Sequence, residues 1–198
     1  MSQPGVNRLL PIGVLGIDNR KLGIWIFLAS EVMLFGGFFG SFINLREANI
    51  VTFNETAALL NANLGALNTF ILITSSLTMA LAVGARASSH DNMKWVKLFI
   101  ILTIILAFCF MGVKTIEYTE KFSHHYAPHT NLFFSFYFIM TGLHALHVLV
   151  GIILMFWMLI GVSKNPVKWD LCAVENAGLY WHFVDVVWIF LFPLLYLT

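Results

Sequence analysis

Charged residues are scarce in this 198-residue sequence: Asp, Glu, Lys and Arg make up 11% of it, against about 25% in a typical soluble domain. The formal net charge is +1, which gives no reason to expect nucleic acid as a partner. The two cysteines, Cys109 in an apolar run and Cys172 in a polar loop, should lie at different depths, so no disulfide is expected. A P-loop, a glycine-rich dinucleotide fingerprint, a CxxC pair and a haem-attachment motif are also lacking, so the sequence supports none of these nucleotide-binding and redox classes.

Apolar residues are abundant instead: 59% of the chain is hydrophobic, 19 residues are Phe, and the mean hydropathy is +0.83. They occur in blocks long enough to cross a bilayer. The blocks predict an all-α, polytopic membrane protein with a bundle of five transmembrane helices. These helices are expected at about 23–45, 65–85, 95–118, 131–162 and 177–198, so that 1–22 is an N-terminal cytoplasmic segment and 23–198 the transmembrane domain.

The basic residues predict the orientation of this bundle. With the N-terminus inside, the inner segments hold eight Lys and Arg residues and the outer segments hold two, Arg46 and Lys121, while Lys114 lies in the third helix. Cytoplasmic loops of membrane proteins carry an excess of Lys and Arg. The sequence therefore predicts an N-terminus inside and a C-terminus outside the membrane.

Ionisable residues occur inside three of the predicted helices. His144 and His147 are one helical turn apart, as are His182 and Asp185, and Glu31 lies at a comparable depth in the first helix. An ionised carboxylate is costly in hydrocarbon, so we expect Glu31 to be protonated or paired. These groups fit either a proton-linked role or a set of hydrogen bonds that fixes helix packing. No nucleophile–base–orienter set is apparent, so no catalytic residue is predicted.

The first helix also carries a stripe of small residues, Gly36, Gly37, Gly40 and Ser41. Gly40 lies about 180° around the helix from Glu31. Small residues allow membrane helices to approach closely. We expect this stripe to be a subunit-packing face that contacts another helix, in this chain or in a different subunit, while Glu31 faces its own bundle.

At the outer end of the third helix, Lys114 and Glu117 are one turn apart and are predicted to form an interfacial ion pair. The loop that follows contains three histidines, but no acid or cysteine nearby completes a ligand set, so a solvated loop is the favoured interpretation. His144 and His147 share one helix and cannot bind opposite faces of one haem. No metal site and no cofactor of its own are expected.

Four motifs resemble subunit III of the haem–copper oxidases, which comprise cytochrome c and quinol oxidases. They are GIWIFLASEVMLF at 23–35, KTIEY at 114–118, GLHALHV at 142–148 and YWHFVDVVWIF at 180–190. The resemblance covers all five predicted helices. It implies an accessory subunit without redox metal, in the bacterial cytoplasmic (inner) membrane, next to a subunit I that holds haem and copper and a further subunit II.

The resemblance also implies roles. Subunit III supports proton uptake into subunit I, stabilises the active site during turnover and holds phospholipids in a cleft between two groups of helices. Glu31 matches the family's buried, carbodiimide-reactive carboxylate. The other matching polar positions are His144, His147, His182, Asp185 and Glu117.

The sequence departs from the longer family members, which have seven helices. The two helices that precede the first one here are missing, as in bacterial five-helix forms, and the lipid cleft normally lies beside them. The electron donor, cytochrome c or quinol, stays open. Two alternatives also stay open: a relative associated with nitric oxide reductases, and a self-contained proton-coupled carrier.

Overall fold

The computed structural model describes residues 19–88, 92–164 and 170–197. Within these ranges the chain forms helices and no strand: α1 (Asn19–Ala48), α2 (Ile50–Ala57), α3 (Ala62–Ser88), α4 (Met93–Ser123), α5 (Leu132–Lys164) and α6 (Leu171–Tyr196). Five of them, all but α2, are long and apolar enough to cross a membrane. This confirms the predicted all-α class with five membrane-spanning helices. The orientation in the membrane stays a prediction, and most of the predicted N-terminal segment, 1–18, lies outside the described residues.

Two of the differences from the sequence-based expectation concern α6 and α2. The last helix begins at Leu171 and not near 177, because the Asp170 side chain caps it by accepting a hydrogen bond from the Ala173 amide at 3.0 Å. The short α2 was not predicted. It buries Phe53, whose ring meets the rings of Phe42 and Phe133 edge-on at 5.3 and 5.7 Å, so it ties α1 to α5.

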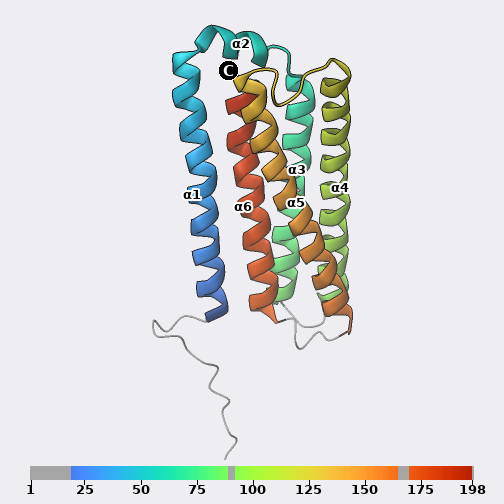
Figure 1. Ribbon diagram of the computed structural model, residues 1–198. Coiled ribbons are helices and arrows are strands. Elements are labelled where there is room, and N and C mark those ends of the chain that lie inside the picture. Colours follow the sequence, from blue (N-terminus) through green and yellow to red (C-terminus); the bar gives the residue numbers. More distant parts are fainter. Residues whose placement is uncertain (1–18, 89–91, 165–169, 198) are drawn as a thin grey trace, which may run out of the picture.

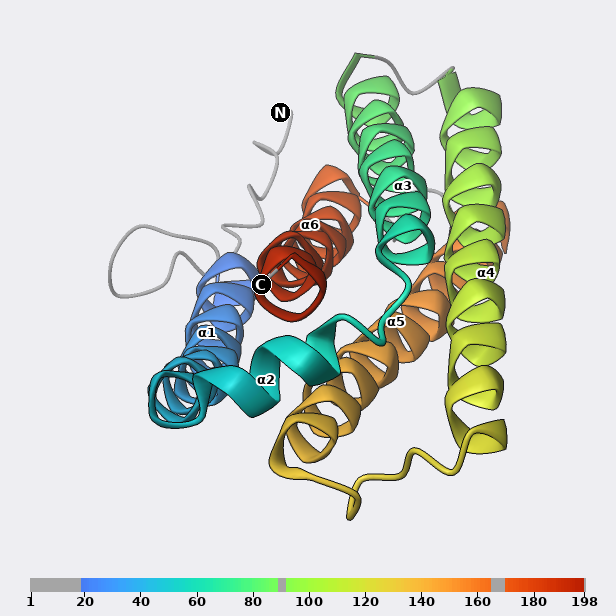
Figure 2. The same ribbon diagram turned by 90° about the horizontal axis from the view of Figure 1, so that it is seen from above.

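The helices are arranged around α6, which packs against α3, α5 and α1 (Figures 1 and 2). Helices α3, α4, α5 and α6 form the compact part of the bundle, and Figure 2 shows α6 between α1 and α3. Helix α1 buries Leu28, Phe35 and Phe42, which are seven residues apart and form a single strip. Partly buried residues such as Phe38 and Phe39 pack beside this strip, and the exposed remainder of the helix surface is left for lipid or for another chain.

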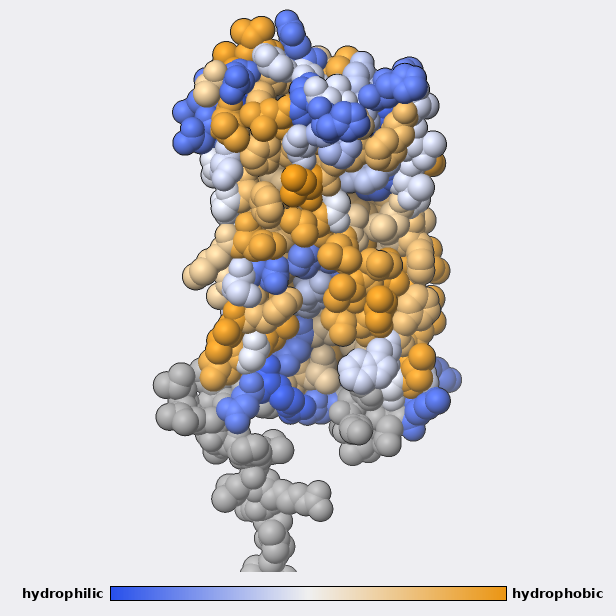
Figure 3. Space-filling model, viewed as in Figure 1, coloured by the Kyte–Doolittle hydropathy of each residue, from blue (hydrophilic) through white to orange (hydrophobic). Residues whose placement is uncertain are grey.

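The outer surface of the bundle has the distribution expected of a membrane protein. Figure 3 shows a broad hydrophobic belt between two more hydrophilic ends, with some hydrophilic atoms at mid-height on this face. Large apolar side chains of the long helices, such as Met33, Phe70 and Trp157, are exposed. Such a surface is stable against lipid chains and not against water.

Candidate functional site

A carboxylate–imidazole pair joins α1 to α5. His147 Nε2 lies 3.1 Å from Glu31 Oε2, and the two side chains are 14% and 18% exposed. Phe35 covers the imidazole edge-on, with ring centroids 5.3 Å apart. Glu31 is twelve residues into α1, which places the pair about 18 Å from the start of that helix. The structure thus places Glu31 beside a partner in its own bundle.

The hydrogen bonds of His147 define where the pair's proton lies. Its Nδ1 is 2.8 Å from the Leu143 carbonyl oxygen, which only accepts, so Nδ1 carries a hydrogen. Nε2 then either accepts from a protonated Glu31 or, when itself protonated, donates to the carboxylate. One proton is therefore held between α1 and α5. The Tyr180 hydroxyl donates to the His147 carbonyl at 3.0 Å, which connects α6 to the same place.

His144, one turn before His147, faces a different part of the bundle. It is completely buried, and neither ring nitrogen has a hydrogen-bond partner among the described residues. Its ring packs against Phe110 of α4 and Trp188 of α6, with centroids 5.6 and 5.2 Å away. In this environment His144 serves as a neutral aromatic packing group.

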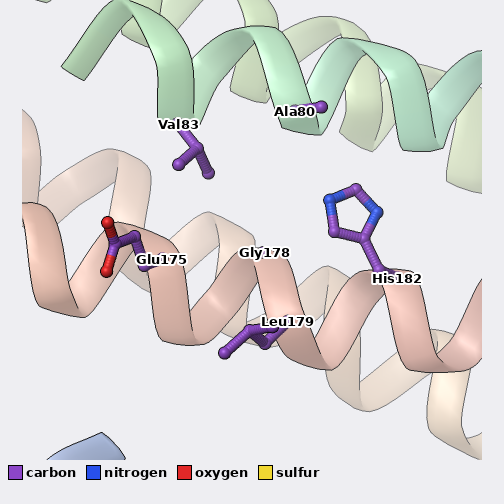
Figure 4. A pocket seen from close by; sticks show the side chains of 6 residues that line it. All are labelled: Ala80, Val83, Glu175, Gly178, Leu179 and His182. Atoms are coloured by element: carbon purple, nitrogen blue, oxygen red, sulfur yellow. The ribbon is translucent and has the colours of Figure 1, made fainter. Parts of the chain in front are cut away.

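His182 and Asp185 line a cavity of about 420 Å³ on the α3–α6 side. Ser76 Oγ of α3 lies 2.7 Å from His182 Nδ1. Asp185 is only 3% exposed, and in the described parts of the chain its carboxyl oxygens make no hydrogen bond of good geometry, the Ser76 hydroxyl being the neighbouring polar group. Figure 4 shows His182 extending from α6 toward α3, beside Ala80, in an adjoining cavity.

The predicted polar residues thus do not form one cluster. Glu31 and His147 meet where α1 faces α5, whereas His182 and Asp185 turn toward α3. Helix α6 packs against α1, α3 and α5 and lies between these places. Equal depth in the membrane was predictable from helix lengths, but the direction of each side chain depends on how the helices are rotated.

Lys114 and Glu117 form the predicted pair, at 3.0 Å, but the pair is not interfacial. The side chains are 4% and 0% exposed, because α4 continues to Ser123 and carries them inside the bundle. Lys114 Nζ also donates to the Tyr196 hydroxyl at 2.8 Å, and the Tyr137 hydroxyl donates to Glu117 at 2.9 Å. Aromatic rings surround the ammonium group at 5.0 to 5.4 Å, namely those of Tyr118, Tyr137, Trp188 and Tyr196.

Sequence reasoning missed the tyrosines around the Lys114 ammonium group and the burial of Lys121. Tyr137 and Tyr196 come from α5 and α6, far from Lys114 in sequence, and only the fold brings them together. Lys121 is 4% exposed and donates to the Leu59 carbonyl at 2.7 Å, which ties the end of α4 to the α2–α3 loop. A helical pattern continued through the polar residues 119–123 would have given the signal for the longer α4.

The small-residue stripe of α1 is exposed. A methyl group added at Gly36, Gly37 or Gly40 would meet no atom within 4 Å in the described residues. The stripe therefore does not form a close contact within the described chain, and its predicted packing concerns another chain.

The structure describes both cysteines and the loop histidines. Cys109 and Cys172 are not joined by a disulfide. Among the described residues no group of three or more His, Cys, Asp or Glu side chains is placed to hold a metal ion. His125 has a positive φ of 60° in the turn between α4 and α5.

Comparisons with known proteins give a consistent result. The family described as Cytochrome c oxidase subunit III matches residues 15–198. A cytochrome c oxidase subunit 3 of Alkalihalophilus pseudofirmus is 35% identical over 90% of this chain and 86% of its own length. A probable quinol oxidase subunit 3 of Staphylococcus haemolyticus is 33% identical over 90% of this chain and 88% of its own. The chain belongs to the cytochrome c oxidase subunit III family.

Proposed function

We propose that the chain is the accessory third subunit of a respiratory haem–copper terminal oxidase in a bacterial cytoplasmic membrane. In this proposal it binds subunit I, which holds the haem and copper, within a complex that also contains subunit II, and it binds membrane lipids. The observation that carries the proposal is the Glu31–His147 pair, which holds one proton at mid-membrane depth between α1 and α5. Intramembrane ionisable groups of this kind are commonly functional.

The pair supports proton uptake by the complex in one of two ways. It either exchanges its proton with partner groups or holds α1 in the position that a partner requires. Its partial exposure supports the first way, since a polar group of a partner subunit can contact a pair that the chain does not fully cover. The second is supported because the pair joins α1 directly to α5, beside the strip through which α1 packs on the bundle.

The small-residue stripe of α1 is proposed as the face for a partner helix. Gly36, Gly37, Gly40 and Ser41 leave the α1 backbone open, and no described side chain occupies the space above the glycines. Close helix approach at such stripes stabilises membrane helix pairs. A bulky substitution, Gly40→Leu, is therefore expected to reduce the amount of assembled complex.

A phospholipid chain fits a separate cavity of about 300 Å³ between α1, α5 and α6. Its lining is almost entirely apolar and includes Phe27, Leu154, Trp157 and Tyr180. Such a lining suits an acyl chain and offers little to a polar ligand. Lipid binding by this subunit is proposed on that basis.

The test is purification of the complex through this chain in mild detergent, with a reduced-minus-oxidised spectrum and oxygen consumption driven by cytochrome c or quinol. We expect oxidase haem bands, and one of the two donors will support turnover. Nitric oxide turnover with b- and c-type haem would instead place the chain with a reductase. Transport of protons by the purified chain alone in liposomes would support a carrier and contradict the proposal.

The role of the pair is tested in the same complex. A hydrophobic carbodiimide is expected to label Glu31 in preference to the exposed acids Glu47 and Glu55. Glu31→Gln keeps a hydrogen-bonding group and should retain the complex, whereas Glu31→Lys should lose it. Equal labelling of the three acids, or equal loss in both variants, would contradict the assignment.

A further inference from the structure

The strongest unexplained feature of the chain is the carboxyl group of Asp185. It is almost fully buried, and neither of its oxygens has a hydrogen bond of good geometry among the residues that the structure describes, although the Ser76 hydroxyl is near enough to interact with it. A buried polar group without a partner costs stability, and a carboxyl group costs more than most. Asp185 lines an open cavity together with Ser76 and His182. The missing partner can therefore come from outside the chain.

The cavity is part of a longer groove between α3 and α6. A second cavity of about 300 Å³ shares Ala80 and His182 with the first and continues to Glu175, as Figure 4 shows. Fourteen residues of α6 separate Glu175 from Ile189 in the first cavity, which is about 21 Å along the helix. The groove thus follows the helix axes through much of the membrane.

The lining of the groove is apolar except at two levels. Ile73, Leu77, Val186 and Ile189 line the first cavity, and all four are exposed. Polar groups occur about midway along α6, where Ser76, His182 and Asp185 gather, and at the end where Glu175 lies. Glu175 already has a partner, since Lys21 Nζ is 2.7 Å from its carboxylate. Among the described residues that line the groove, the unused hydrogen-bonding capacity therefore lies at the middle level.

Three properties of the groove indicate what binds in it: its length, its openness and the single level at which it has an unused polar group. A lipid acyl chain would fill an apolar groove but has no hydrogen-bonding group at this depth. Water alone would not cover the exposed apolar rims. A transmembrane helix presents a ridge of apolar side chains over such a length and can carry one polar side chain at the required level.

We propose that the α3–α6 groove is the docking site of a transmembrane helix from a partner subunit, and that this helix places a Ser, Thr, Asn or Gln side chain against Asp185, Ser76 and His182. The proposal rests on the proposed function, because it requires that the chain work inside a complex. It adds a second contact face to the stripe on α1. Asp185 anchors the partner helix by a hydrogen bond that the isolated chain leaves unmade.

The test is site-specific photo-crosslinking in the intact complex. A benzophenone amino acid is placed at Leu77, on the rim of the groove, where the native side chain is 60% exposed. The control position is Ile105 of α4, which is 51% exposed. It lies at nearly the same depth, since Thr78 and Thr103 are hydrogen-bonded across α3 and α4 at 2.7 Å.

The expected result is a polypeptide adduct at Leu77, mapped by mass spectrometry to a membrane helix of another subunit, and a lipid adduct at Ile105. A lipid adduct at Leu77 as well would overturn the proposal. So would an adduct with a lipid-soluble, quinone-sized molecule. Only preparations that contain haem and consume oxygen are irradiated, so failure of the groove assignment is separate from failure of the oxidase assignment.

A pair of substitutions tests the anchor itself. Asp185→Asn keeps groups that donate and accept, so the complex, without crosslinking, should retain the partner subunit identified at Leu77 after detergent washing. Asp185→Leu removes them, and we expect partner retention to fall about three- to twenty-fold, the range for one hydrogen bond between membrane helices. Equal retention in both variants, with the Asp185→Leu chain folded by circular dichroism, would also overturn the proposal.

Discussion

The Lys114–Glu117 pair allows a quantitative test of the packing described here. The two charged atoms are 3.0 Å apart inside the bundle, which corresponds to about 5 kcal/mol of attraction at an effective dielectric constant of about 20. Removing one partner leaves the other charge buried. We therefore expect Lys114→Met to lower the free energy of unfolding by about 3–5 kcal/mol, and Glu117→Leu to do the same.

The double variant distinguishes this reasoning from simple loss of packing. Lys114→Met combined with Glu117→Leu removes both charges, so no uncompensated charge remains, although the hydroxyls of Tyr137 and Tyr196 lose their acceptor. We expect the double variant to lose about 2–3 kcal/mol less than the sum of the two single losses.

The assay is unfolding of the purified chain in mixed detergent micelles, followed by tryptophan fluorescence, to which Trp188 contributes from 5.0 Å beside the Lys114 ammonium group. Leu77→Ala, at an exposed position, is the control for the effect of shortening a side chain. Additive losses in the double variant would refute the reasoning, because they would mean that the two charges do not stabilise each other.

Two further predictions concern helix contacts. Gly151→Ala should destabilise the chain by about 1–3 kcal/mol in the same assay, because its new methyl group would lie 2.6 Å from the buried Trp181 ring. Gly142→Ala is the control and should not destabilise the chain, since its methyl group would meet no atom of the described residues within 4 Å. Asp170→Ala should cost about 1 kcal/mol through loss of the α6 cap. Asp170→Asn keeps the cap and loses the exposed ion pair with Arg20, which should cost less than about 1 kcal/mol. Similar losses in both members of a pair would contradict the packing or capping assignment.

The sequence predicted the fold class well because hydropathy alone determines which segments enter a bilayer. The ends of the helices were less predictable, since polar residues can still be helical. Glu175 and Asn176 lie inside α6. Because these residues are polar, the helix was predicted to begin after them, which is too late in the chain. The cap at Asp170, three residues before Ala173, was the available signal.

The candidate residues were predictable by type and depth, but their neighbours were not. Glu31 and His147 were expected at a similar level, and the structure joins them. Asp185 was expected in the same group and instead faces α3. Hydropathy does not report helix rotation, because lipid-facing and bundle-facing positions of a membrane helix are similarly apolar.

Polar groups inside the bundle and polar groups near its surface differ in how many partners they have within the chain. This difference indicates where other subunits bind. Inside the bundle, Lys114 and Glu117 have several partners within the chain. Beside α6, the Glu31–His147 pair is partly exposed and Asp185 borders an open groove. A membrane protein that worked alone would be expected to enclose such groups, because lipid offers them no hydrogen bonds. The sides of the bundle where these polar groups come near the surface are therefore the sides on which we expect the partner subunits to bind.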